Sequence, residues 1–290
     1  MNTLVTGSAT GFGRLIVELL AAEGHLVFAT MRGTADRNSV VAAALGAIPG
    51  VHVLELDVTS EDSVGAAVGQ ALSIAGRIDC VVNNAGFAGF GLTEGFSMDQ
   101  WQALLNTNLL GCVRVNQAVL PSMRGQGGGL LIHISSIAGR LAAVYMAPYA
   151  ASKWALECYA EVLRLELAPL KIDSVVVEPG KYLTDILAKA DNGGDRSELS
   201  LAYGDADMSG RFMDWFVGSM EQVGRNPGEV AGKVRDLMNL PFGARPFRTL
   251  SGEDAVGLQP YNDHADGIRL SLGDLTGLHE LMQTPPKQSE

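Results

Sequence analysis

Short apolar runs alternate along the chain with segments whose apolar residues recur every three or four positions. The runs predict strands, and the recurring spacing predicts helices that bury one face. We expect strands over 2–6, 25–30, 51–56, 79–82, 130–134, 172–177 and 247–250. We expect helices over about 15–24, 59–75, 97–120, 149–169 and 227–240, with one or two short polar helices within 251–282. Alternating strands and helices predict an α/β fold, a Rossmann-type doubly wound parallel sheet of about seven strands flanked by helices.

No Ser/Pro-rich linker and no block of charge divides the chain before its last residues. We therefore expect one domain over residues 1–283 and a flexible tail over 284–290. Within 185–225 the composition changes, and Phe212, Trp215 and Phe216 recur with Met residues at near-helical spacing. This segment would form either ordinary core or a substrate-binding loop that closes as a lid over an apolar pocket.

Composition and charge narrow the possible partners. The 290 residues carry a net charge of −11, which argues against binding to nucleic acid or to an anionic membrane surface. The apolar runs are too short to span a bilayer, and a strand follows Met1 directly, so we expect no signal peptide and a cytoplasmic protein. Cys80, Cys112 and Cys158 lie in apolar segments without CxxC spacing and are expected to be reduced, packed thiols. The histidines show no ligand spacing, and no metal site is expected.

A glycine-rich turn, Thr6-Gly7-Ser8-Ala9-Thr10-Gly11-Phe12-Gly13, links the first strand to the first helix. A strand, a glycine turn and a helix in this order can hold the pyrophosphate of a dinucleotide. Gly7 would permit the tight turn, Gly11 the close approach of backbone to phosphate, and Gly13 the packing of helix on strand. A plain glycine-rich turn is the competing interpretation, because the spacing is GxxxGxG rather than GxGxxG.

The ends of the next strands face the adenosine in such folds. Thr30 stands where an acid would bind the free ribose hydroxyls, and Arg32 follows two residues later. This favours NADP(H), with Arg32 binding the 2′-phosphate, although Arg32 could also be a solvated loop residue. Asp57 could bind the adenine amino group or serve only as a turn acid. The Asn83–Gly86 segment could run beneath a flat ring or form an ordinary turn.

Tyr149 and Lys153 are four residues apart, which places both on one face of a helix. An ammonium beside a phenol favours the phenolate and is expected to lower the pKa of Tyr149 toward neutrality. A phenol with such a pKa can exchange a proton with a carbonyl or an alcohol. Ser135 and Ser136 end the fifth strand at the same edge of the sheet. Asn108 interrupts a predicted helix, where Asn often marks a local distortion or a bound water.

Taken together and in this order, the motifs resemble those of the classical short-chain dehydrogenase/reductase (SDR) family, densely over residues 2–185 and loosely beyond. The resemblance implies that Tyr149 is the general acid/base, that Lys153 lowers its pKa and binds the nicotinamide ribose, and that Ser136 polarises the substrate carbonyl. Ser136 is chosen over Ser135 because the family serine usually lies thirteen residues before the tyrosine, and 149 − 13 = 136. Tyr145 is a rival phenol without a lysine four residues later.

The same resemblance implies a catalytic role for Asn108, which would hold a water that links Lys153 to solvent. It also implies a set of cofactor-binding residues: Gly7, Ser8, Thr10, Gly11, Phe12, Gly13, Arg32, Asp57, Val58, Asn84, Ala85, Gly86, Tyr149, Lys153, Pro179, Gly180 and Thr184. Lys181 and Tyr182 depart from the family, which usually has small or apolar residues there. The long segment after Thr184 resembles that of hydroxysteroid and retinol dehydrogenases.

These inferences predict an NADP(H)-dependent oxidoreductase, a ketoreductase or alcohol dehydrogenase, that moves a hydride between nicotinamide and a carbonyl or secondary alcohol of a fairly apolar substrate. The alternatives are an NADP-binding regulator without turnover, and a dehydratase or epimerase on the same scaffold. The resemblance also implies a homodimer or homotetramer, formed through the helices that contain Asn108 and Tyr149.

Overall fold

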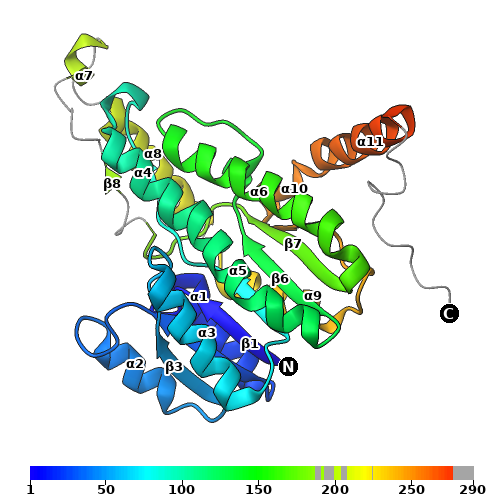
Figure 1. The fold of residues 1–290 in the computed structure, drawn as a ribbon. Coiled ribbons are helices and arrows are strands. Elements are labelled where there is room, and N and C mark those ends of the chain that lie inside the picture. Colours follow the sequence, from blue (N-terminus) through cyan, green and yellow to red (C-terminus); the bar gives the residue numbers. More distant parts are fainter. Residues whose placement is uncertain (187–190, 193–198, 204–207, 224, 277–290) are drawn as a thin grey trace.

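The computed structural model describes residues 1–186, 191–192, 199–203, 208–223 and 225–276. Its centre is a parallel sheet with the strand order β3-β2-β1-β4-β6-β7-β9 (Figure 1). The strands are β1 (Asn2–Thr6), β2 (Leu26–Met31), β3 (Val51–Glu55), β4 (Cys80–Asn83), β6 (Gly129–Ile134), β7 (Ile172–Pro179) and β9 (Arg248–Ser251). The predicted doubly wound α/β fold is confirmed. The tail predicted over 284–290 lies outside the described residues.

Helices cover both faces of the sheet. One face packs against α1 (Gly11–Ala22), α2 (Ser39–Gly46) and α9 (Gly228–Asn239), with Ile16, Leu20 and Val234 buried in the contact. The other face packs against α3 (Glu61–Ala75), α5 (Gly111–Gly125) and α6 (Ala147–Leu167), with Val68, Val119 and Leu163 buried. Each fully buried aliphatic side chain contributes about 1.5–3 kcal/mol to folding, so these two layers hold the sheet together.

The order of the strands reverses between β1 and β4. These strands are neighbours in the sheet, with Thr3 opposite Cys80 and Val5 opposite Val82, although a long stretch of chain separates them. In open parallel sheets a crevice for ligands forms at such a reversal, outside the carboxyl ends of the strands. The glycine turn after β1 and the Asn84–Gly86 turn after β4 therefore meet at this crevice.

The helix predicted over 97–120 is interrupted. It begins as α4 (Met98–Leu105), passes through a π-helical segment (Asn106–Leu110) and continues as α5. Asn108 lies in the π segment, which confirms the local distortion expected of it. The helix start was also predicted correctly, because Ser97 and Gln100 form a reciprocal capping box.

Several further elements lie around this framework. They are β5 (Gly89–Phe90) paired with β8 (Asp191–Asn192), α7 (Leu199–Ala202), α8 (Met208–Val223), α10 (Glu253–Val256), α11 (Gln259–Thr276), and the 3-10 turns η1 (Thr93–Gly95), η3 (Ile137–Gly139) and η4 (Ala168–Leu170). Helix α11 lies on the opposite side of the molecule from α2 (Figure 1). Within the described part of the chain, no helix combines the length and the apolarity needed to cross a membrane. The expectation of three packed thiols was wrong for Cys158, which is exposed, whereas Cys80 and Cys112 are buried.

Candidate active site

The glycine turn has the backbone shape that its sequence predicts. Gly7 and Gly11 have φ values of +69° and +56°, a region that side chains disfavour. A Cβ atom on Gly13 would lie 2.4 Å from the Gly7 oxygen and from Nδ2 of Asn84. Gly13 therefore allows α1 to pack directly against the turn, as expected.

Hydrogen bonds join the turn after β1 to the turn after β4. The Thr6 hydroxyl accepts from the backbone N–H groups of Asn84 and Ala85, both at 3.0 Å. In return, Nδ2 of Asn84 donates to the Thr6 carbonyl at 2.9 Å and to the Gly7 carbonyl at 3.2 Å. The Asn84 side chain therefore holds the glycine turn next to the Ala85–Gly86 backbone through these hydrogen bonds.

A cavity of about 1000 Å³ opens at the carboxyl edge of the sheet. Of the predicted residues, the following line it: Gly7, Thr10, Gly11, Phe12, Arg32, Asp57, Val58, Asn84, Ala85, Gly86, Ser136, Tyr149, Lys153, Pro179, Gly180 and Thr184. Its size and its glycine-lined wall fit a bound dinucleotide. Ser8, Gly13 and Asn108 do not line it. Ser8 is buried and bonds within the fold, because its hydroxyl donates to the Val5 carbonyl at 2.9 Å.

Two arginines lie at the β2 end of the cavity. Arg32 Nη1 lies 3.7 Å from Asp57 Oδ2, and Arg37 lines the same end although sequence reasoning did not single it out. Glu55 orders the loop between them by accepting from the backbone N–H groups of Gly33 and Thr34, both at 2.7 Å. Burial alone would raise the pKa of Asp57, but its bonds from Thr59 and the charge of Arg32 together bring that pKa below its ordinary value.

Tyr149 lies in the first turn of α6 and is buried, and its hydroxyl is close enough to Ser136 for that serine to lower its pKa. Ser136 follows β6, and its hydroxyl accepts from the Ala138 N–H at 3.1 Å, which fixes the start of η3. Ser135 also lines the cavity, but its hydroxyl donates to Glu157 at 2.7 Å. The contact with Tyr149 supports the choice of Ser136 over Ser135.

The expected lowering of the Tyr149 pKa was wrong for the free protein. Burial raises the pKa of Tyr149, and the nearby Ser136 hydroxyl offsets only part of that rise. Lys153 Nζ lies 5.8 Å from the centre of the Tyr149 ring and donates to the Ile134 carbonyl at 2.8 Å. Burial also lowers the pKa of Lys153 to about 8. Helical spacing predicted that the two groups share a face, but it could not predict how strongly burial opposes the phenolate.

Asn108 lies behind the cavity and connects two of its walls. Its Nδ2 donates to the Phe87 carbonyl and to the Ser152 hydroxyl, both at 3.0 Å, and its Oδ1 accepts from the Phe87 N–H at 3.1 Å. A Cβ atom on Gly86 would lie 3.0 Å from Asn108 Oδ1 and 3.8 Å from Lys153 Nζ. The Asn108 side chain therefore ties the β4 turn to the Tyr149 helix, while its role toward a water stays a prediction.

The turn after β7 carries the two residues that depart from the family pattern. Tyr182 is buried, and its hydroxyl donates to Glu229 at 2.8 Å while lying 2.8 Å from the Ser251 hydroxyl. Lys181 extends toward α8, where its Nζ donates to Ser219 at 3.2 Å and lies 4.7 Å from the Trp215 ring centre. Neither side chain displaces Pro179, Gly180 or Thr184 from the cavity lining.

Aromatic residues form the remaining wall. Phe90 packs against Phe216 at 5.4 Å between ring centres, and Phe216 stacks on Phe212 at 5.7 Å. Tyr145, which has a left-handed φ of 62°, packs its ring 5.2 Å from Phe212. Phe212, Trp215 and Phe216 of α8 line the cavity, and Trp215 is also exposed. A lid role for the segment 185–225 stays a prediction.

A family model described as short chain dehydrogenase matches residues 1–194. The chain therefore belongs to the short-chain dehydrogenase family, as its motifs and sheet indicated. It is 33% identical over 257 residues to human retinol dehydrogenase 8, an alignment that covers 84% of this chain and 79% of that protein. It is 38% identical over 181 residues to a 3-ketodihydrosphingosine reductase of Bacteroides thetaiotaomicron, covering 62% of this chain and 64% of that reductase, just under two thirds of its length.

Among solved structures, a variant of actinorhodin polyketide ketoreductase with NADPH superposes with a TM-score of 0.71 and 29% sequence identity, over 86% of this chain and 94% of that one. The fold of the chain and its membership of the short-chain dehydrogenase family are thereby established. Its cofactor preference and substrate have to be inferred from its own residues.

Proposed function

We propose that the protein is an NADP(H)-dependent carbonyl reductase or alcohol dehydrogenase. The observation that carries this proposal is the shared cavity: Ser136, Tyr149 and Lys153 line the same space as the glycine turn. A cofactor held on that turn would supply the hydride to or from a substrate carbon. The chain supplies the proton and orients the reacting carbonyl.

Each of the three side chains has a distinct role in this proposal. Tyr149, whose pKa is raised by burial, is protonated at neutral pH and can donate its proton to the oxygen of a ketone. Ser136 lies near the Tyr149 hydroxyl, where it acts to lower the pKa of the phenol, and it would polarise the same ketone oxygen. Lys153, held in place by the Ile134 carbonyl, would bind the nicotinamide ribose and support the negative charge left on Tyr149.

A preference for NADP(H) is supported by the β2 end of the cavity. Thr30 there is buried, and its hydroxyl donates to the Val5 carbonyl at 3.0 Å, so no acid occupies this position to bind the ribose hydroxyls or repel a 2′-phosphate. Arg32 and Arg37 supply two positive charges to that end. The similar actinorhodin ketoreductase was solved with NADPH.

An apolar substrate is supported by the wall built from Phe90, Phe212 and Phe216. The names of two relatives point the same way, since a ketosphingoid and a retinoid are largely hydrocarbon.

We further infer a cytoplasmic homo-oligomer. The three cysteines are all free, and α6 exposes Trp154 and Val162 on the surface expected to meet a second copy.

The decisive experiment offers the full chain a panel of aromatic, alicyclic and long-chain ketones with NADPH and with NADH. Loss of reduced-nicotinamide absorbance with NADPH is the expected result. Tight NADPH binding without any oxidation across the panel would favour a regulator. Product formation without a net change in absorbance would favour a dehydratase or epimerase.

A further inference from the structure

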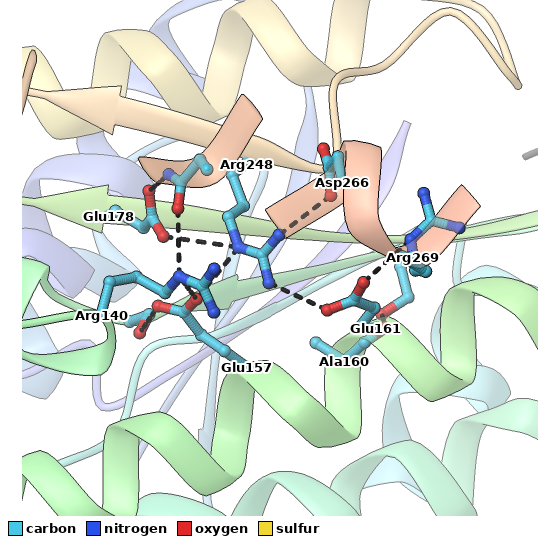
Figure 2. Close-up of polar contacts among 11 residues, drawn as sticks. Arg140, Glu157, Ala160, Glu161, Glu178, Arg248, Asp266 and Arg269 are labelled. Atoms are coloured by element: carbon cyan, nitrogen blue, oxygen red, sulfur yellow. Dashed lines mark hydrogen bonds and ion pairs between the residues drawn. The ribbon is translucent and has the colours of Figure 1, made fainter. Parts of the chain in front are cut away.

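A cluster of buried charged side chains joins α6, β7, β9 and the residue after η3 (Figure 2). We call it the buried ion cluster, and it consists of Arg140, Glu157, Glu178 and Arg248. Arg248 Nε lies 3.1 Å from Glu157 and 3.6 Å from Glu178, while Arg140 Nε lies 3.8 Å from Glu157. Charges removed from water need partners on every side, so each member is held in one position by the others.

The cluster touches three separate segments of the proposed active site. Glu157 lies one helical turn after Lys153 on α6 and accepts the hydrogen bond from Ser135, the residue before Ser136. Arg140 follows η3, the turn that begins at Ser136. Glu178 immediately precedes the Pro179–Gly180 turn. These segments are far apart in sequence, and the cluster links them.

Asn262 closes the cluster from α11. It is 3% exposed, its Nδ2 donates to Glu178 Oε2 at 2.8 Å, and its Oδ1 accepts from Arg140 Nε at 3.0 Å. An amide side chain carries a donor and an acceptor side by side, so it can donate to a carboxylate and accept from a guanidinium at the same time. Tyr261, the preceding residue, lies under the Arg140 guanidinium at 4.7 Å from its ring centre. Nothing in the α11 sequence pattern marked Asn262 as functional.

We propose that Asn262 is a positioning residue for the proposed reaction, which holds the Ser136 turn and the Pro179–Gly180 turn in register through Arg140 and Glu178. Without its amide, Glu178 Oε2 loses its only described donor and Arg140 loses an acceptor inside a low-dielectric region. Both turns would then shift to find new partners or admit water. Ser136 aligns the substrate carbonyl and the second turn borders the nicotinamide site, so a relative shift of the two would lower the rate of the chemical step.

The test compares Asn262→Ala with Asp173→Asn in the full-length chain. Asp173 forms a buried ion pair with Arg245 at 2.6 Å at the amino-terminal end of β7, away from the cavity. Both variants remove one partner from a buried network, and both are expected to lower Tm. Only Asn262→Ala is expected to lower kcat, by about 10–100-fold, because small misplacements of reacting groups have effects of this size. The KM for NADPH should stay near the wild-type value. His264→Ala, an exposed change on the same helix, should alter neither.

Asn262→Asp keeps the acceptor for Arg140 and removes the N–H donor to Glu178. Its carboxylate can still accept from Arg140, but where Glu178 is ionised the two carboxylates face each other with no proton between them, among Glu157, Arg248 and Asp266. As the pH falls through its pKa of about 8, Glu178 takes up a proton that it can donate to the new carboxylate. The kcat of Asn262→Asp relative to wild type should therefore rise as the pH is lowered, which a merely structural role would not produce.

Hydrogen–deuterium exchange supplies a readout that does not depend on turnover. The backbone N–H groups of Gly139, Arg140 and Leu141 are bonded within the Ser136 turn, and their exchange should accelerate in Asn262→Ala but not in Asp173→Asn. Equal kcat and equal exchange in the two variants would overturn the inference. This proposal rests on the proposed function. A wild-type chain that binds NADPH but reduces no ketone would refute that function. The exchange comparison would still decide the role of Asn262.

Discussion

The Lys153 ammonium lies 5.8 Å from the centre of the Tyr149 ring and donates a hydrogen bond to the Ile134 carbonyl. Burial raises the pKa of the phenol and lowers the pKa of the ammonium to about 8. At neutral pH the pair is therefore a neutral phenol beside a charged ammonium. That combination suits the donation of a proton to a carbonyl better than the removal of one from an alcohol.

This pair predicts how ketone reduction depends on pH. Lys153 is protonated below its pKa of about 8 and loses its charge as the pH rises through that value. Loss of the charge removes the support for the developing phenolate. We expect kcat/KM for ketone reduction to be level near neutrality and to fall as the pH rises above about 8. A pH profile in the reductive direction measures this, and a rate that stays level or increases well above that pH would contradict the assigned role of Lys153.

Tyr149→Phe removes the proton donor and little else. We expect kcat to fall by about 10²–10⁴-fold, the usual contribution of a general acid. NADPH binding, measured by fluorescence of the bound cofactor, should change little because the glycine turn is untouched. Tyr145→Phe is the matched control, since its ring packs on Phe212 and it does not line the cavity. Substantial activity in Tyr149→Phe, or an equal loss in Tyr145→Phe, would refute the assignment of Tyr149.

The sequence predicts those parts of the site that local spacing determines. The glycine turn, the helical register of Tyr149 with Lys153, and the distortion at Asn108 all follow from residues a few positions apart. The choice of Ser136 required the family spacing, because Ser135 carries the same hydroxyl group. Only the folded structure shows that the two serines have different partners.

The remaining features depend on contacts between distant residues. Asn262 and Glu178 are 84 positions apart, and neither carries a motif. Arg37 enters the cavity because Glu55, on the neighbouring strand, orders the loop before it. The direction of the Tyr149 pKa shift also depends on burial by segments far along the chain. Periodicity predicts that helices and strands exist, but it does not predict which side chains they enclose.

Arg32 and Arg37 should determine the preference between the two cofactors. Removing one charged contact to a phosphate costs about 1.5–3 kcal/mol, so Arg32→Ala should lower kcat/KM for NADPH by about 10–100-fold. The value for NADH should change little, and Arg37→Ala should act in the same direction. Arg235→Ala removes an equal charge from α9, where Arg235 pairs with Asp236 and Glu23, and serves as the control. Equal losses for NADPH and NADH in Arg32→Ala would exclude Arg32 as the 2′-phosphate ligand.

Glu178 should make the free energy of unfolding depend on pH. Burial, followed by the neighbouring charge of Glu157, raises the pKa of Glu178 to about 8, although Arg248 and Asn262 act in the opposite direction. Between the ordinary glutamate pKa and this value the folded state binds the proton and the unfolded state does not. The contribution of Glu178 to stability is therefore greatest at low pH and decreases as the pH rises toward about 8, by at most about 1.4 kcal/mol per pH unit.

Glu178→Gln replaces the carboxyl by an amide that cannot ionise. The variant should accordingly gain stability relative to wild type as the pH rises from about 5 to about 8, with no further gain above the upper value. Urea unfolding of both proteins across this range measures the difference directly. Glu161→Gln is the control, because Glu161 pairs with Arg248 at 3.0 Å and Arg269 at 3.1 Å at the partly exposed margin of the network. A difference between Glu178→Gln and wild type that stays constant with pH would mean that Glu178 is already ionised in the folded protein, and that Arg248 compensates its charge fully.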